Sequence, residues 1–295
     1  MYLKYIIRGG GVMKNRKGKR VFFIIAGSMV GIGLIMAVIG LAMGATQKTI
    51  FSAARTYGIY ESGNKQEIDK KEIDKKEQND LSLVKESYQE VKKLDLDIDL
   101  GEVVIIHKED IEGIKIVNKS EKRNVSIDYN EEDAKLTVKS EDGSWLHWKH
   151  QYDAHIIIYV PTDYEFEEVD LDLAAGRIEA DRIQATKLDI DIDAGELIIE
   201  SFKAQEIEAS TGAGRIKATG DVKEKIEIES GVGEVSLTLL GQESDFNYNL
   251  EVGIGEILIG DHTYSGIKDK HIESALAKKS AEVNCGVGSV KLNFK

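Results

Sequence analysis

Apolar and polar residues alternate repeatedly in the C-terminal two thirds of the chain. In L-D-I-D-I-D-A-G-E-L-I-I-E, residues 188–200, every second residue before the glycine is aliphatic, and aspartates stand between. A period of two places the aliphatic side chains on one face of a β-strand, because successive side chains point to opposite faces. The pattern therefore predicts strands with one buried face and one solvated face.

A glycine-centred unit repeats along this region, with spacings of 19, 19 and 19 between four consecutive copies. The repeat glycines are Gly101, Gly176, Gly195, Gly214, Gly233, Gly255 and Gly288, the last two at spacings of 22 and 33. Positions −7, −5, −3 and −1 before each glycine are mostly apolar or small, and the apolar positions then shift to +2 and +4. The chain must bend or bulge at the glycine, which has no Cβ to clash.

Units this small cannot bury an apolar row alone, but they can do so by stacking strand on strand at ~4.8 Å. We therefore expect residues 88–295 to form an all-β ectodomain, a β-solenoid-like stack of repeats of about 19 residues. Positions −7 to −1 are expected to face inward.

Two outward columns alternate in charge from copy to copy, which predicts ladders of ion pairs worth ~0.2–1 kcal/mol each. Position −8 reads Glu168, Lys187, Glu206 and Lys225, and position +1 reads Arg177, Glu196, Arg215 and Glu234.

In the four copies spaced by 19 residues, two other outward columns are acidic apart from Ser210. Positions −6 and −4 together carry Asp170, Asp172, Asp189, Asp191, Glu208, Glu227 and Glu229. One interpretation is a solvated face that keeps strands from pairing with other chains. The other is an acidic stripe that takes Ca²⁺ or a cationic partner. Calcium prefers about six to eight converging oxygens, which a flat sheet offers poorly, so a cationic peptide or protein surface is the better candidate.

Charge and cysteine content exclude several classes of function. The formal net charge is −13, which argues against nucleic acid, because polyanions are bound by clustered Lys and Arg. The single cysteine, Cys285, excludes an intrachain disulfide and a thiol-rich metal site. Cys285 lies at position −3, so we expect a buried, unreactive side chain.

Residues 21–45 are free of charge, and 25 residues at ~1.5 Å each span a ~30 Å hydrocarbon core. They predict a transmembrane helix. The basic residues within 1–20 should stay in the cytoplasm and place the rest of the chain outside, in a single-pass cell-membrane protein. A cleaved signal peptide is the alternative, since residues 42–44, A-M-G, include small residues, but its apolar region would be ~7–15 residues. The first twelve residues look unlike the rest, so Met13 is a candidate true start.

Residues 46–87 contain E-I-D-K-K twice in tandem and lack the apolar heptads of a coiled coil. We interpret this segment as a charged stalk or linker.

Catalytic residue types cluster only in W-L-H-W-K-H-Q-Y-D-A-H, which contains His147, His150 and His155. Their spacing is not that of a helical zinc motif. Trp145 and Trp148 are candidates for contacting a partner or lipid headgroups, with ordinary loop packing as the alternative. The G-x-G sequences sit between strands as turn glycines, and no nucleophile or nucleotide fingerprint is present. We expect no enzymatic activity and no cofactor.

Three stretches carry a family resemblance: H-I-I-I-Y-V-P-T-D-Y at 155–164, V-D-L-D-L-A-A-G-R-I at 169–178, and the later G-x-G strands. Over roughly residues 90–295 the chain resembles the bacterial putative-adhesin domain of unknown function, found in membrane-anchored or secreted proteins of Firmicutes. The resemblance implies a β-solenoid ectodomain, with relatives in cell-envelope stress operons. It implies no catalytic residues.

These observations predict a membrane-anchored extracytoplasmic binding or sensing module of the cell envelope, adhesin-like or linked to envelope stress. Its partner would be an envelope protein, a cationic peptide or a glycan. One alternative is a calcium-dependent polysaccharide-active β-helix enzyme. Another is a self-assembling structural solenoid that joins end to end through an uncapped edge after Phe294.

Overall fold

The computed structural model describes residues 87–120, 124–141, 154–266 and 269–295. Within these ranges the only helical element is a 3-10 turn, η1 (Glu243–Asp245). Four long strands are β2 (Lys93–Lys108), β7 (Phe166–Ile192), β8 (Glu196–Thr211) and β9 (Arg215–Ser230). The others are β1 (Ser87–Tyr88), β3 (Ile114–Asn118), β4 (Asn124–Asn130), β5 (Lys135–Glu141), β6 (Ala154–Pro161), β10 (Glu234–Leu239), β11 (Phe246–Val252), β12 (Glu256–Ile259), β13 (His262–Ser265), β14 (Lys270–Ile272), β15 (Lys279–Cys285) and β16 (Ser289–Phe294).

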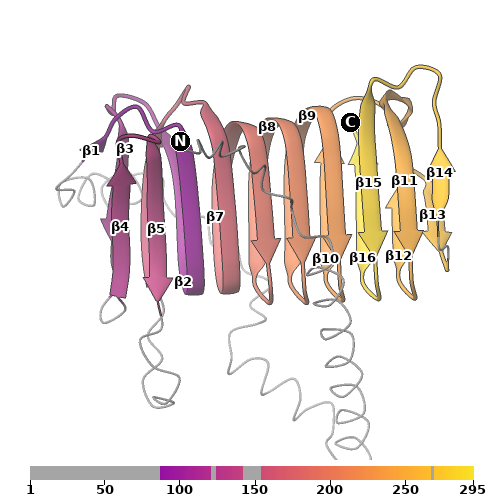
Figure 1. Cartoon of the computed structure of the whole chain (residues 1–295), viewed down its shortest axis with the longest axis horizontal. Helices are drawn as coiled ribbons and strands as arrows, with labels where there is room; N and C mark the ends of the chain where they lie inside the picture. The colour runs from indigo at the N-terminus through magenta and orange to yellow at the C-terminus, as the bar shows by residue number, and fades with distance from the viewer. Residues whose placement is uncertain (1–86, 121–123, 142–153, 267–268) are drawn as a thin grey trace, which may run out of the picture. The chain divides into compact units, whose positions relative to one another are not determined.

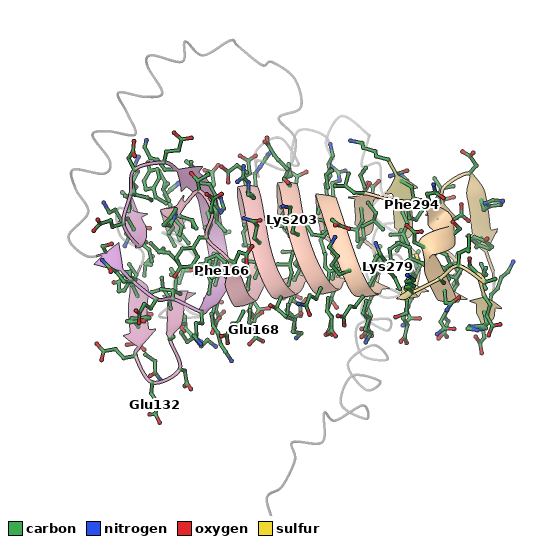
Figure 2. The ribbon with its side chains drawn as sticks, turned by 90° about the horizontal axis from the view of Figure 1, so that it is seen from above. Glu132, Phe166, Glu168, Lys203, Lys279 and Phe294 are labelled. Atoms are coloured by element: carbon green, nitrogen blue, oxygen red, sulfur yellow. The ribbon has the colours of Figure 1, made fainter. Side chains whose placement is uncertain are left out.

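Each long strand bends and contributes to two layers of a parallel β-solenoid (Figure 1). In β8, Leu197 and Ile199 follow a repeat glycine and belong to what we term the post-glycine layer. Ile207 and Ala209 precede the next glycine and belong to the pre-glycine layer. All four side chains are buried in one core between the layers. Seen from above, the turns of the solenoid, or rungs, follow one another and carry side chains on their outer surfaces (Figure 2).

Successive rungs stack in register. Arg177, Glu196, Arg215 and Glu234, each directly after its repeat glycine, are Cα partners from β7 through β8 and β9 to β10. The all-β, solenoid-like stack of repeats is therefore confirmed, with 16 strands in the described ranges. Stacking in register brings every repeat position into a column, so the sequence columns become physical columns.

The order of the rungs differs from the order of the sequence at both ends. β2 lies between β7 and the later strands β5 and β6. Likewise β15 and β16 lie between the β9–β10 rung and the β11–β12 rung. Gly288 therefore neighbours Gly233, and Gly255 lies one rung further out. The spacings of 22 and 33 do not reveal this order, because spacing alone does not show where the chain doubles back.

Antiparallel strands pair with the outermost rungs. β3 and β4 pair with β6 and β5 at one end, and β13 and β14 pair with β12 and β11 at the other. The predicted open edge after Phe294 was wrong. β16 pairs with β10 on one side and with β12 on the other, because the final strand returns into the sheet.

The inward row ends earlier than the sequence pattern predicts. Positions −7, −5 and −3 are buried, as in Leu188, Ile190 and Ile192, but Ala194 and Val232 at position −1 are exposed. Residues −2 to 0 form a tight turn that reverses the chain, so the alternation of the strand stops at −3. In that turn, the N–H of Ala213 donates to the carbonyl oxygen of Asp193 in the preceding rung (2.7 Å).

The segments 1–20, 21–45 and 46–87 fall outside the described residues, except Ser87 at the start of β1. The transmembrane, cytoplasmic and stalk assignments therefore stay predictions. In the part of the chain that the structure describes, no helix is long and apolar enough to cross a membrane.

Gly214→Ala should lower the free energy of unfolding, because an added Cβ would lie 2.6 Å from the carbonyl oxygen of Gly195 and 2.7 Å from Cγ2 of Ile192. Backbone would have to move, and we expect a loss of about 1–3 kcal/mol in urea unfolding. The neighbouring substitution Ala213→Ser, at an exposed turn position, should change it by less than about 0.5 kcal/mol. Equal stability of Gly214→Ala and wild type would contradict the close stacking of the turns.

Candidate functional site

Carboxylates cover the outer surface of the pre-glycine layer. Because Leu188, Ile190 and Ile192 point into the core, Asp189 and Asp191 between them point outward. The same alternation holds in the neighbouring rungs, and the register places these acids side by side. We term this surface the acidic face; it comprises Asp95, Asp97, Asp170, Asp172, Asp189, Asp191, Glu208, Glu227, Glu229 and Glu282. It contains all seven acidic residues that the sequence singled out.

Three members of the acidic face were missed at the sequence level. Asp95 and Asp97 pair directly with Asp170 and Asp172, and Glu282 pairs with Glu227. The signal for the first two was the stretch L-D-L-D-I-D-L-G that ends at Gly101, which has the same pattern as the later copies. Glu282 stands at position −6 of Gly288, and only the rung order in the structure places it beside Glu227.

Four lysines partly neutralise the acidic face. Lys135 lies 2.6 Å from Asp95, Lys139 lies 3.0 Å from Asp97, and Lys187 lies 2.9 Å from Asp189. Lys225 lies 2.8 Å from Glu227. These pairs are partly solvated, so each contributes at most about 1 kcal/mol. The carboxylates outnumber these lysines, and the surface keeps a net negative charge.

Burial and neighbouring carboxylates raise the pKa of two members of the acidic face. Burial and the neighbouring Asp172, Asp189 and Asp95 raise the pKa of Asp170 to about 6, against the lowering effect of Lys135. Burial, followed by Asp191 and Asp97, raises the pKa of Asp172 to about 6. The stacked acids are thus held in an unfavourable arrangement that protons or bound cations would relieve.

The outer surface of the post-glycine layer carries the predicted ion-pair ladder. Glu196 lies 3.3 Å from Arg177 and 3.4 Å from Arg215, and Arg215 lies 3.5 Å from Glu234. Lys291 continues the ladder, 2.8 Å from Glu234. The alternation at position +1 is therefore confirmed, and this surface is internally neutralised where the acidic face is not.

Position −8 behaves differently from the predicted ladder. Lys93 pairs with Glu168 across the rungs at 3.3 Å, as charge alternation predicts. Lys187 and Lys225 instead donate to Asp189 and Glu227, two residues further along their own strands. The prediction was wrong for these lysines, because the acidic column beside them offers closer partners than the neighbouring glutamates.

The aromatic and histidine cluster is only partly described. Trp145, Trp148, His147 and His150 lie outside the described residues, whereas His155 lies in β6, about half exposed and 3.4 Å from Glu102. Among the residues that the structure describes, no group of three or more His, Cys, Asp or Glu side chains is arranged to hold a metal ion.

The turn glycines and the cysteine have structural roles. The G-x-G sequences lie in the turns between strands, as predicted. Cys285 is buried at position −3, where its S–H donates to the carbonyl oxygen of Gly288 (3.2 Å). Burial raises the pKa of its thiol, which disfavours the reactive thiolate.

The stability of the domain should respond to the titration of Asp170 and Asp172. Their folded-state pKa of about 6 lies above the ordinary value, so between about pH 4 and 6 the folded chain holds more protons than the unfolded chain. Their contribution to the free energy of unfolding therefore becomes less unfavourable as the pH falls through about 6. Removing both charges with Asp170→Asn and Asp172→Asn should raise the melting temperature at pH 8.

The gain should shrink toward pH 5, where wild type has neutralised the same groups. Other carboxyls, such as Glu234, have a pKa lowered by a partner, here Lys291, and they destabilise the fold as the pH falls. Their effect is the same in variant and wild type, so it cancels in the difference between the two. A difference in melting temperature that stays constant from pH 5 to 8 would show that the charges of the two aspartates do not destabilise the fold.

Comparison with known proteins finds one matching family and several similar solved structures. Residues 162–284 match the Toastrack DUF4097 family, and no curated protein matches the chain. Three similar solved structures each align over 70% of this chain and over 94% of the chain in that structure. One is a putative cell adhesion protein from Clostridium sporogenes, at 19% identity and a TM-score of 0.43. The others are putative adhesins from Bacteroides fragilis (13%, 0.31) and Parabacteroides distasonis (12%, 0.30). The match over residues 162–284 confirms the resemblance to a putative-adhesin domain of unknown function.

Proposed function

We propose that this chain is a non-catalytic binding module of the bacterial cell envelope, and that its acidic face binds a cationic partner. The observation that carries the proposal is a column of like charges across successive rungs. On six successive rungs position −6 is acidic, with Asp95, Asp170, Asp189, Glu208, Glu227 and Glu282, and the rung beyond Glu282 carries the neutral Asn249 there.

Such a column opposes its own stacking. Side chains directly opposite one another in a sheet are close neighbours, and like charges there destabilise the pairing. The chain alternates charge successfully at position +1, so the acidic columns do not follow from composition alone. A polycation lying across the rungs would contact several carboxylates at once and relieve their repulsion.

The predicted helix at 21–45 and stalk at 46–87 would hold the module outside the cytoplasmic membrane, where it would meet envelope proteins, cationic peptides or glycans with basic groups. The similar solved structures are called putative adhesins and a putative cell adhesion protein, names that agree with a binding role. A self-assembling solenoid is less well supported, because antiparallel strands occupy both ends of the stack.

The proposal predicts that the full-length chain binds a fluorescent oligolysine of about ten residues in fluorescence anisotropy, and that salt weakens the complex. Asp189→Asn with Asp191→Asn should weaken binding by about tenfold at low salt, because two carboxylates are lost from the middle of the face.

A matched control changes the net charge equally at another place. Glu131 and Glu132 are exposed in the turn between β4 and β5, at the end of the stack where Figure 2 labels Glu132. Glu131→Gln with Glu132→Gln should change the affinity by less than about twofold. If both double variants weaken binding equally, the effect comes from net charge alone, and a defined binding face is rejected. Binding lost on calcium removal would favour the calcium-dependent alternative.

A further inference from the structure

Three aliphatic side chains stand exposed at the tips of three successive turns. The exposed fractions are 40% for Val232, 46% for Val287 and 86% for Ile254. Each occupies position −1, directly before a repeat glycine. We term these residues the aliphatic turn row. Single exposed aliphatic residues are ordinary on a protein surface, but three at one repeat position form a continuous feature.

Backbone hydrogen bonds fix the row in register. The N–H of Val287 donates to the carbonyl oxygen of Gly231, and the N–H of Ile254 donates to that of Gly286, both at 2.8 Å. The rungs follow one another at ~4.8 Å, so the three side chains lie next to one another.

The residue before each of them is a glycine, which adds no polar side chain at the tip. Those glycines are Gly231, Gly286 and Gly253. Turns usually carry polar residues such as Asp, Asn or Ser, and the turns in the middle of the stack carry the smaller Ala194 and Ala213 at the same position. The row therefore gains apolar surface toward the β12 end of the stack.

The aliphatic turn row borders the acidic side of the solenoid. Glu229 precedes Val232 by three residues, and Glu251 precedes Ile254 by three. Three residues span at most ~10 Å of chain. Glu282, on the rung between them, is exposed and stands beside Glu227. One ligand could thus touch carboxylates and aliphatic side chains together.

We propose that the aliphatic turn row and the adjoining carboxylates bind a basic amphipathic polypeptide, with its cationic side on the carboxylates and its apolar side on Val232, Val287 and Ile254. This inference rests on the proposed function and specifies the class of ligand. Charge complementarity selects this occupant, because Glu229, Glu251 and Glu282 would repel a surface of anionic lipids. A helix of about 18 residues is ~27 Å long, enough to cross five rungs.

The test compares two labelled peptides of about 18 leucines and lysines, one with leucine on a single helical face and one with the same composition scrambled. The full-length chain should bind the segregated peptide about tenfold more tightly than the scrambled one. Val232→Ser, Val287→Ser and Ile254→Ser together should reduce this preference to less than about twofold, since the apolar contacts are lost.

Leu240→Ser with Leu276→Ser is the matched control. These side chains are 50% and 74% exposed, and they lie next to the ends of β10 and β15 that are remote from the repeat turns. The control should keep the full preference. Binding of oligolysine, measured in parallel, separates the two proposals.

If oligolysine binds wild type and the triple variant keeps the preference for the segregated peptide, the present inference fails and the proposed function stands. If neither peptide nor oligolysine binds wild type, both fail. If wild type shows no preference and sediments as a dimer that the triple variant cannot form, a second copy covers the row and the inference is overturned.

Discussion

Hydrogen bonding between rungs in register is the constraint on which the rest of this structure depends. Backbone N–H groups in the turns and strands donate hydrogen bonds to carbonyl oxygens of the neighbouring rung. Residues at one repeat position therefore lie side by side. Glycines permit the close approach at the turns, where a Cβ on Gly195 would meet the carbonyl oxygen of Gly176 at 2.9 Å and Cδ2 of Leu173 at 2.6 Å. Once the register is fixed, it also determines which residue types stand together in each column.

The columns differ in what they contribute. Inward columns of Leu, Ile, Val and Ala form one continuous core, and the burial of this apolar surface is the main source of stability. The outward column at position +1 alternates in sign and stabilises the register. The columns at −6 and −4 oppose it, and the pKa of Asp170 and Asp172 is raised to about 6 by burial first and by the neighbouring carboxylates second. A surface that destabilises its own fold, in a chain that can alternate charge elsewhere, is the reason why we propose that it binds a cationic partner.

Much of this architecture could be read from the sequence, because period-two alternation and 19-residue spacing are local properties of the chain. The inward row at Leu188, Ile190 and Ile192 and the ladder at Arg177, Glu196, Arg215 and Glu234 follow from them directly. The reversed rung order at Gly288 and Gly255 could not, since it depends on strands that pair after long excursions. The exposure of Val232 and Ile254 was missed for another reason: hydrophobicity signals burial in a strand, whereas these residues stand at a turn tip. The lysine partners of the acidic face were missed because side-chain geometry, and not column position, decides where Lys187 bonds.

The central claim, that acidic positions from distant copies form one column, can be measured as a distance. In a Cys285→Ser background, spin labels at Asp170→Cys and Glu282→Cys would be separated by four rung steps, through Asp189, Glu208 and Glu227. At ~4.8 Å per rung, pulsed electron paramagnetic resonance should give a narrow distribution near ~20 Å. A broad distribution, or a mean distance beyond about 30 Å, would show that the copies do not stack in this order and that no continuous acidic face exists.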